Sequence, residues 1–118
     1  MKLTYLGLDN TSLVPTHRFV LLKDKTKIGK GGIRTRTTKA GDIVYEIFPE
    51  FRNQGYGSEL LKLLLREAKN LGKNNVVLVC RVQNLASKRI IETNGGILRS
   101  EIERKKGGNR LQYEIHLR

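Results

Sequence analysis

The sequence lacks the features of an exported, metal-binding or membrane-spanning protein. Its one cysteine, Cys80, excludes an internal disulfide, and no group of Cys and His residues has the spacing of a metal site. No run approaches the roughly 18 apolar residues of a membrane span. Thr4 and Gly7 interrupt the apolar start of the chain, which excludes a signal-peptide core. We therefore expect a metal-free, cytoplasmic protein that does not enter a membrane.

Acidic residues are scarce: 11 Asp and Glu accompany 23 Lys and Arg, and the formal net charge is +12. This excess favours an anionic partner, whether a polyphosphate ligand, an acidic surface or a nucleic acid, and does not choose among them. Hydrophobic residues make up 38% of the chain and charged residues 29%, which is typical of a folded domain. The length of 118 residues predicts a single domain, residues 1–118, with a thin core.

Hydrophobic periodicity predicts strands that alternate with helices. The predicted strands are residues 17–22, 28–38, 43–48 and 76–82. The last of these is apolar on both faces, so it is expected to lie centrally. Leu60, Leu64 and Ala68 recur at helical spacing within a predicted helix at 58–71, and a shorter helix is predicted at 85–93. A hairpin of 97–104 and 111–117 follows. This order predicts an α/β (α+β) sandwich around one mixed sheet.

The segment between the strand at 43–48 and the helix at 58–71 is suited to phosphate binding. Pro49 ends the strand, and Arg52-Asn53-Gln54-Gly55-Tyr56-Gly57 leads directly into the helix. A helix start offers unpaired N–H groups and the positive end of the helix dipole, and glycines let a phosphate approach the backbone. Arg52 adds a forked cation. The spacing excludes two better-known phosphate loops, because Leu60 replaces the third dinucleotide-loop glycine and no Gly-Lys-Ser/Thr is present.

The pattern Arg-x-x-Gly-x-Gly before a leucine-rich helix resembles the signature of the GNAT acetyltransferase superfamily, which binds the pyrophosphate of acetyl-coenzyme A in this way. A second match is Asn84-Leu85-Ala86-Ser87, followed by Ile90-Ile91-Glu92 and Asn94-Gly95-Gly96. Together the matches cover about residues 42–96. The resemblance implies a GNAT-like acyl-CoA N-acyltransferase fold, in which helices flank a central mixed, mostly antiparallel sheet.

The resemblance also implies which residues hold acetyl-coenzyme A. The loop and the helix start would bind the pyrophosphate, while Asn84 and Ser87 would lie along the pantetheine arm. Asn84 has a simpler alternative role as the cap of the following helix, and the two roles are compatible. The implied cofactor-binding residues are Ile47, Phe48, Arg52, Asn53, Gln54, Gly55, Tyr56, Gly57, Ser58, Asn84 and Ser87.

Acetyl transfer to an amine needs a proton acceptor for the amine and a donor to the thioester oxyanion. In the family, a backbone N–H of the strand that ends at Pro49 binds the oxyanion, which here implies Ile47 or Phe48. Glu46 is the candidate catalytic base, because it shares a strand face with Val44 and Phe48, where desolvation would raise its pKa. The alternative is an ordinary glutamate that is solvated or ion-paired.

Two features depart from the family pattern. The usual general acid is a tyrosine at the position of Ile91, so a proton for the thiolate would come from water, Ser87 or Tyr113. Tyr113 is otherwise a core strand residue. Residues 1–14 are also too short for the N-terminal strand and helices that normally build the acceptor wall. Such a reduced member would complete its site as a homodimer, act as a minimal enzyme, or bind coenzyme A without efficient transfer.

The sequence therefore predicts an acetyl-coenzyme-A-dependent N-acetyltransferase that acts on a primary amine of a small molecule or a peptide. A non-catalytic coenzyme-A-binding regulatory or interaction module is the first alternative, supported by Ile91 and the short N-terminus. A nucleic-acid-binding protein is the weaker alternative, because the basic stretches lack interleaved aromatic residues. Basic residues around the predicted hairpin would hold an acidic partner or form a solvated surface; these are Arg99, Arg104, Lys105, Lys106 and Arg110.

Overall fold

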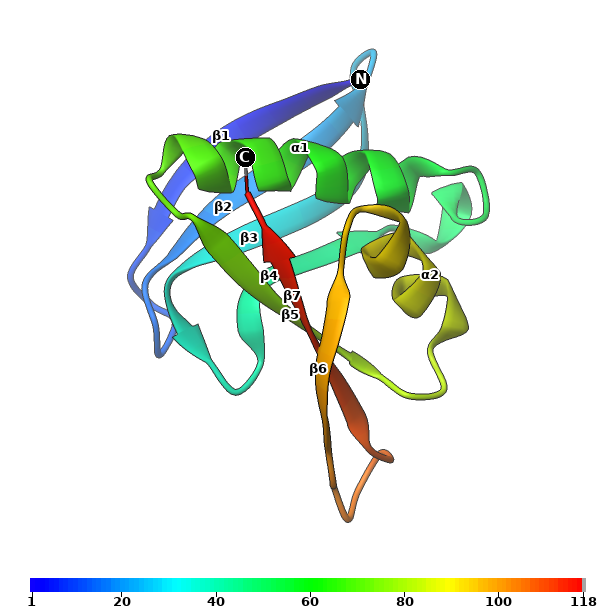
Figure 1. Cartoon of the computed structure of the whole chain (residues 1–118). Coiled ribbons are helices and arrows are strands. Elements are labelled where there is room, and N and C mark those ends of the chain that lie inside the picture. Colours follow the sequence, from blue (N-terminus) through cyan, green and yellow to red (C-terminus); the bar gives the residue numbers. More distant parts are fainter. Residues whose placement is uncertain (118) are drawn as a thin grey trace.

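The computed structural model describes residues 1–117, which form one seven-stranded sheet and two α-helices (Figure 1). The strands are β1 (Lys2–Asp9), β2 (Thr16–Lys23), β3 (Thr26–Thr38), β4 (Gly41–Ile47), β5 (Asn75–Arg81), β6 (Ile97–Ile102) and β7 (Arg110–His116). The helices are the short 3-10 turn η1 (Pro49–Phe51), α1 (Tyr56–Asn70) and α2 (Leu85–Thr93). The sheet order is β1-β2-β3-β4-β5-β7-β6. Strands are antiparallel in the pairs β1–β2, β2–β3, β3–β4, β5–β7 and β6–β7.

The predicted α/β fold is confirmed, and the predicted elements are present with ends that differ by at most two residues. Strand β1 was not predicted. Its pairing with β2 slips between Tyr5 and Gly7, so its apolar residues do not alternate as they would in a regular strand. Residues 10–15 then join β1 to β2 directly, with no helix between them in the described part of the chain. The expectation of reduced N-terminal elements is therefore wrong for the strand, which is β1, and agrees with the structure for the helices, which are absent from residues 1–15.

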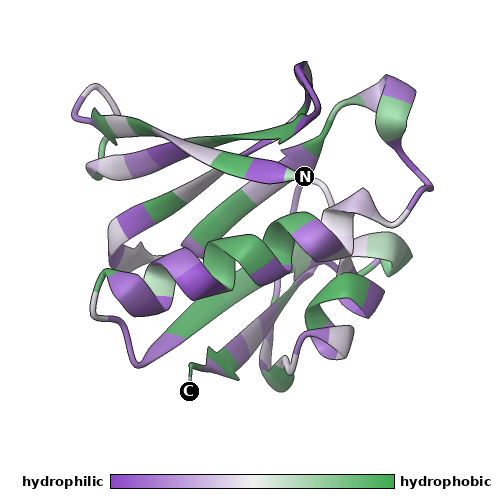
Figure 2. Ribbon diagram, turned by 90° about the horizontal axis from the view of Figure 1, so that it is seen from above, coloured by the Kyte–Doolittle hydropathy of each residue, from purple (hydrophilic) through white to green (hydrophobic). Residues whose placement is uncertain are grey.

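Helix α1 supplies one wall of the core. Its apolar stripe buries Leu60, Leu61, Leu64 and Ala68, and the alternation of hydrophobic and hydrophilic residues along the helix is visible in Figure 2. Gly31 of β3 lies beneath this stripe, where a Cβ would be 2.6 Å from Leu64 Cδ1. The glycine thus lets α1 pack closely on the sheet, which fixes where the N-terminus of the helix lies.

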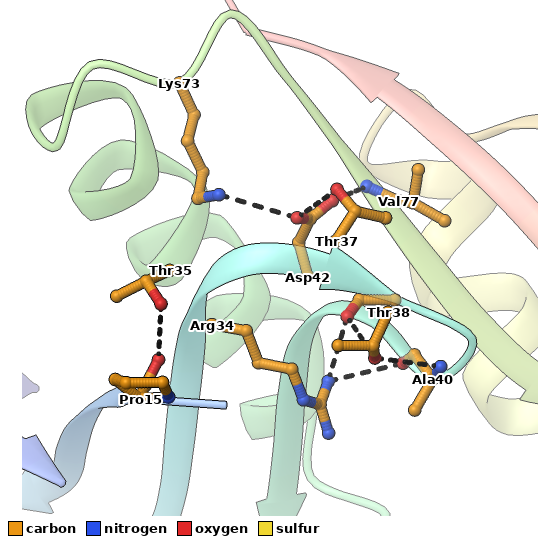
Figure 3. A network of polar contacts seen from close by, with 10 residues as sticks. Pro15, Arg34, Thr35, Thr37, Thr38, Ala40, Asp42, Lys73 and Val77 are labelled. Atoms are coloured by element: carbon orange, nitrogen blue, oxygen red, sulfur yellow. Dashed lines mark hydrogen bonds and ion pairs between the residues drawn. The ribbon is translucent and has the colours of Figure 1, made fainter. Parts of the chain in front are cut away.

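Strands β4 and β5 are held together at one place only. Their single bridge pair is Gly41 with Leu78. Beside it, the buried Asp42 carboxylate accepts hydrogen bonds from the Val77 N–H at 2.6 Å and the Thr37 hydroxyl at 2.7 Å (Figure 3). The rest of β4 has no partner in β5, so the middle of the sheet is open there.

Candidate functional site

A cavity of about 690 Å³ lies at the open part of the sheet, a volume in the range of small-molecule sites. Its walls come from the end of β4, the loop before α1, the first turn of α1 and the first turns of α2. The lining residues are Tyr45, Glu46, Ile47, Phe51, Arg52, Asn53, Gly55, Tyr56, Gly57, Ser58, Asn84, Ala86, Ser87, Arg89 and Ile90. Of Glu46 and the implied cofactor-binding residues, only Phe48 and Gln54 are absent from this lining. Segments distant in the sequence therefore meet at one hollow.

The N-terminus of α1 opens onto this cavity without a side-chain cap. Gly55 is the N-cap residue, with φ of 83° and ψ of 0°, and no side chain accepts from the first turn. Residues other than glycine rarely adopt this left-handed conformation. The first N–H groups of the helix thus remain available to an anion, and the helix dipole adds positive potential at the same point.

Arg52 is held against the end of β4. Its Nε donates a hydrogen bond to the Ile47 carbonyl oxygen at 2.9 Å, and its terminal nitrogen lies 3.7 Å from Glu46 Oε1. The guanidinium is half-exposed and borders the cavity. Arg52 therefore fixes the end of the strand and still presents a cationic edge to a ligand.

Gly57 has a packing role in addition to its place in the loop. A Cβ at this position would be 2.8 Å from Ile90 Cδ1, so the glycine lets α2 approach the first turn of α1. The same contact is reinforced by Asn94, whose side-chain N–H donates to Ser58 Oγ at 3.1 Å. Gly57 thus helps to set the width of the cavity between the two helices.

The segment after β5 begins α2 with a side-chain cap. Asn84 Oδ1 accepts a hydrogen bond from the Ser87 backbone N–H at 3.1 Å, so the capping role is confirmed. Both residues line the cavity. The Ser87 hydroxyl is hydrogen-bonded to the Tyr45 hydroxyl at 3.1 Å. The start of α2 is therefore connected to β4 across the open part of the sheet.

Tyr45 was not recognised from the sequence. It directly precedes the candidate residues Glu46 and Ile47 on β4, and its side chain faces the cavity and Ser87. Glu46 projects from the opposite face of the strand and borders the cavity from there. Burial raises the pKa of the Tyr45 hydroxyl above its usual value, so the group stays protonated at neutral pH. Strand alternation predicts that Tyr45 and Glu46 lie on opposite faces of β4. It does not predict that Tyr45 meets Ser87, which belongs to a distant segment of the chain.

The predicted desolvation of Glu46 is wrong. Its side chain is 46% exposed, and its carboxylate lies 3.7 Å from both Lys30 Nζ and an Arg52 nitrogen. Val44, on the same strand face, is also exposed. Within residues 1–117 no helix covers this side of β4. The sequence could not reveal this, because alternation identifies the two faces of a strand without showing which face is buried.

Tyr113 is a core residue, as the simpler interpretation of the sequence predicted. It is fully buried, and its hydroxyl donates a hydrogen bond to Glu92 Oε2 at 2.8 Å. Burial and this hydrogen bond raise the pKa of Tyr113 to about 12. Tyr113 is outside the cavity lining, and Ile91 is likewise buried in the core. Tyr45 and Ser87 are therefore two cavity-lining hydroxyl groups that are hydrogen-bonded to each other.

A smaller hollow of about 370 Å³ lies on the other side of β4. Its lining residues are Leu6, Asp9, Arg18, Phe19, Lys30, Gly31, Val44, Tyr45 and Glu46. Tyr45 and Glu46 border this hollow and the larger cavity alike. The end of β4 is therefore accessible from two sides.

Two further features are absent from residues 1–117. No group of three or more His, Cys, Asp and Glu side chains in this range is arranged to hold a metal ion. None of its helices has the length and apolar character needed to cross a membrane.

Comparison with known proteins gives one family and a set of similar structures. The family model described as acetyltransferase (GNAT) domain matches residues 7–97. No curated protein sequence matches the chain. Similar structures include yncA, a putative acetyltransferase from Salmonella typhimurium with its cofactor acetyl-CoA, with a TM-score of 0.74 and 20% identity over 87% of this chain. The chain spans 65% of the length of that protein.

Two other similar structures have named activities. One is RimL, a ribosomal L7/L12 alpha-N-protein acetyltransferase in complex with coenzyme A, with a TM-score of 0.73 and 18% identity. The match covers 86% of this chain and 62% of the RimL chain. A chimera of the spermidine N-acetyltransferase SpeG from Vibrio cholerae and hSSAT has a TM-score of 0.76 and 17% identity, over 86% of this chain and 67% of its own. At these identities the likeness establishes a shared fold.

Proposed function

Because the chain belongs to the GNAT acetyltransferase domain family, we propose that it transfers an acetyl group from acetyl-coenzyme A to a primary amine of a small molecule or a peptide. In this proposal residues 1–118 act as a single domain. The observation that carries it is the uncapped N-terminus of α1, which opens onto a cavity with Gly55 and Gly57 at its rim.

The residues around the cavity suit acetyl-coenzyme A. Pyrophosphate is favoured at a helix start whose N–H groups are free, and Arg52 can add charge-assisted hydrogen bonds. Asn84 and Ser87, on the segment that follows β5, would lie along the pantetheine arm. Among the similar structures described above, that of yncA is with its cofactor acetyl-CoA and that of RimL is in complex with coenzyme A. The bound cofactor would supply an activated thioester.

The oxyanion of the tetrahedral intermediate requires a backbone donor near the end of β4. The Phe48 N–H already donates to the Ile28 carbonyl oxygen at 2.9 Å. We therefore assign this role to the Ile47 N–H, because Ile47 lines the cavity and precedes the strand end.

Two proton transfers complete the reaction. Glu46 would accept a proton from the amine, directly or through water, as the amine reacts with the thioester, and would then release that proton to solvent. Glu46 suits this role because it borders both hollows, so an amine that enters from the smaller one can reach it. The hydroxyl pair of Tyr45 and Ser87 would donate a proton to the departing thiolate, and solvent would restore that proton.

Ligand binding and turnover test this proposal separately. Acetyl-coenzyme A should raise the free energy of unfolding by about 2.7 kcal/mol at a hundredfold excess over its dissociation constant. A panel of primary amines should then release free thiol from acetyl-coenzyme A. Stabilisation without thiol release from any amine would favour the non-catalytic coenzyme-A-binding module. Absence of stabilisation would overturn the cofactor assignment.

A further inference from the structure

Basic side chains gather around the connection between β6 and β7; they come from the connection itself, from the last residue of β5 and from the first residue of β7. Five side chains form this group, and we call them the cationic turn: Arg81, Arg104, Lys105, Lys106 and Arg110. The hairpin extends away from the body of the sheet (Figure 1). None of the five forms an ion pair with a carboxylate within residues 1–117. Arg99, by contrast, is paired with Glu114 at 3.0 Å and does not belong to this group.

Two of these cations face each other across neighbouring strands. Arg81 of β5 is directly opposite Arg110 of β7. Both guanidinium groups also converge on the turn, since a Cβ on Gly107 would lie 3.3 Å from Arg110 and 3.6 Å from Arg81. Like charges placed opposite each other destabilise a sheet. An anionic partner between them would remove this repulsion.

The cationic turn lies next to the candidate site. The Gln83 side-chain N–H donates to the Gly107 carbonyl oxygen at 3.1 Å, and the Val82 N–H donates to the Asn109 carbonyl oxygen at 3.1 Å. The following residue, Asn84, lines the cavity. The hairpin is therefore anchored to the segment that leads into Asn84, at one edge of the larger cavity.

We propose that the cationic turn binds acidic residues of a peptide acceptor, next to the amine that is acetylated. This inference rests on the proposed acetyltransferase function and adds the class of acceptor. A polyamine would be repelled by five unpaired cations. A single-stranded nucleic acid would gain little beyond charge, because the group includes no aromatic side chain on which a base could stack.

The test compares three peptides that share a free terminal amine. The residues after the amine are glutamates, glutamines or lysines. At low salt, kcat/KM should be highest for the glutamate peptide, by about tenfold over the glutamine peptide, and lowest for the lysine peptide. The glutamate preference should shrink in 1 M salt, where the screening length falls to about 3 Å.

A charge-reversed pair of variants shows whether the turn itself is responsible. Lys105→Glu/Lys106→Glu should abolish the glutamate preference, so that the glutamate peptide no longer has a higher kcat/KM than the glutamine peptide. Lys62→Glu/Arg66→Glu alters net charge by the same amount on the exposed side of α1, and it should retain the preference. Equal loss in both variants would attribute the preference to net charge and overturn the inference.

Other outcomes are also decisive. Equal kcat/KM for the three peptides would overturn the acidic-acceptor inference and leave the acetyltransferase function standing. If acetyl-coenzyme A stabilises the protein but no peptide is acetylated, the inference is overturned again. A fluorescent oligonucleotide could bind at physiological salt more tightly than the glutamate peptide and lose affinity in Lys105→Glu/Lys106→Glu. That result would overturn the inference and identify a nucleic acid, instead of a peptide, as the partner of the cationic turn. Failure of acetyl-coenzyme A to bind would instead remove the proposed function.

Discussion

The Asp42 carboxylate lies 3.4 Å from Lys73 Nζ and joins β4 to the segment that leads into β5 (Figure 3). Asp42 is 3% exposed at its side chain and Lys73 is 20% exposed, so water screens this pair weakly. The carboxylate also accepts from the Val77 N–H and the Thr37 hydroxyl. Three donors therefore converge on Asp42 beside the single β4–β5 bridge.

Asp42→Ala should be strongly destabilising. It leaves the Val77 N–H without its acceptor and Lys73 without its counter-charge, for which we expect a loss of about 3 kcal/mol. Urea unfolding of the variant measures this loss. Glu103→Ala, at an exposed hairpin position without an ion pair in the described residues, serves as the control and should change stability by less than about 0.5 kcal/mol. A small effect at Asp42 would mean that other contacts hold the two strands together.

Tyr45→Phe should reduce turnover with little change in the KM for acetyl-coenzyme A. The variant keeps the ring in place and removes the hydroxyl that contacts Ser87, so we expect kcat to fall about tenfold or more. Steady-state thiol release measures the effect. Tyr113→Phe is the matched control, because it also removes a buried hydroxyl, the one that donates to Glu92. The control should lose about 1 kcal/mol of stability and keep its kcat.

Equal kcat values for Tyr45→Phe and the parent protein would show that the thiolate leaves without help from this hydroxyl. Equal losses in Tyr45→Phe and Tyr113→Phe would attribute the effect to packing. A third result would also be informative: if Ser87→Ala reproduces the loss and the double variant adds nothing, the two hydroxyls act as one unit.

Local features of the site could be predicted from the sequence. The Gly55 turn, the end of β4 at Pro49 and the stripe of α1 each depend on residues a few positions apart, so spacing and residue type were sufficient. The Asn84 cap is equally local. By contrast, Tyr45 and Ser87 are 42 residues apart, and they meet only because β4 and β5 separate after one bridge pair.

Exposure was harder to predict than position. Glu46 was expected on a covered face because its strand neighbours are apolar, but the layer that would cover Val44 is missing from the described chain. Arg52 was predicted as a cation near phosphate, whereas its hydrogen bond to the Ile47 carbonyl could not be inferred from composition. In both cases the side-chain environment depends on elements that the local sequence does not encode.

The alkaline limit of stability should reflect Tyr113. Its pKa is raised to about 12 in the folded protein by burial and the Glu92 hydrogen bond, from a reference value of 10.0. A group whose pKa is raised on folding contributes stability that is complete below its unfolded pKa and is lost as pH rises through the folded pKa. Stability should therefore decline between about pH 10 and 12. Tyr113→Phe should show a shallower decline in the melting temperature over this interval; an identical decline would assign it to other groups.

Glu46→Gln tests the proposed base. The substitution keeps the size of the side chain and removes the charge that accepts the amine proton, so kcat should fall about a hundredfold. Affinity for acetyl-coenzyme A should change little, because Arg52 keeps its hydrogen bond to the Ile47 carbonyl. Glu50→Gln, in the exposed turn η1, removes a carboxylate of the same kind outside the cavity lining and should leave kcat unaltered. Unchanged turnover in Glu46→Gln would exclude Glu46 from the mechanism.

Gly55 and Gly72 offer a matched test of the phosphate site. Both have positive φ, 83° and 92°, and a Cβ at either position would meet no atom within 4 Å. Alanine should therefore cost a similar amount at each, about 1 kcal/mol of backbone strain. The two positions differ in place: Gly55 begins α1 at the cavity, and Gly72 follows the other end of the helix. Gly55→Ala should weaken acetyl-coenzyme A binding about tenfold by calorimetry, because strain is relieved by moving the N–H groups that hold phosphate. Gly72→Ala should lose the same stability and keep its affinity for acetyl-coenzyme A. Equal affinities for both variants would show that the start of α1 does not take part in cofactor binding.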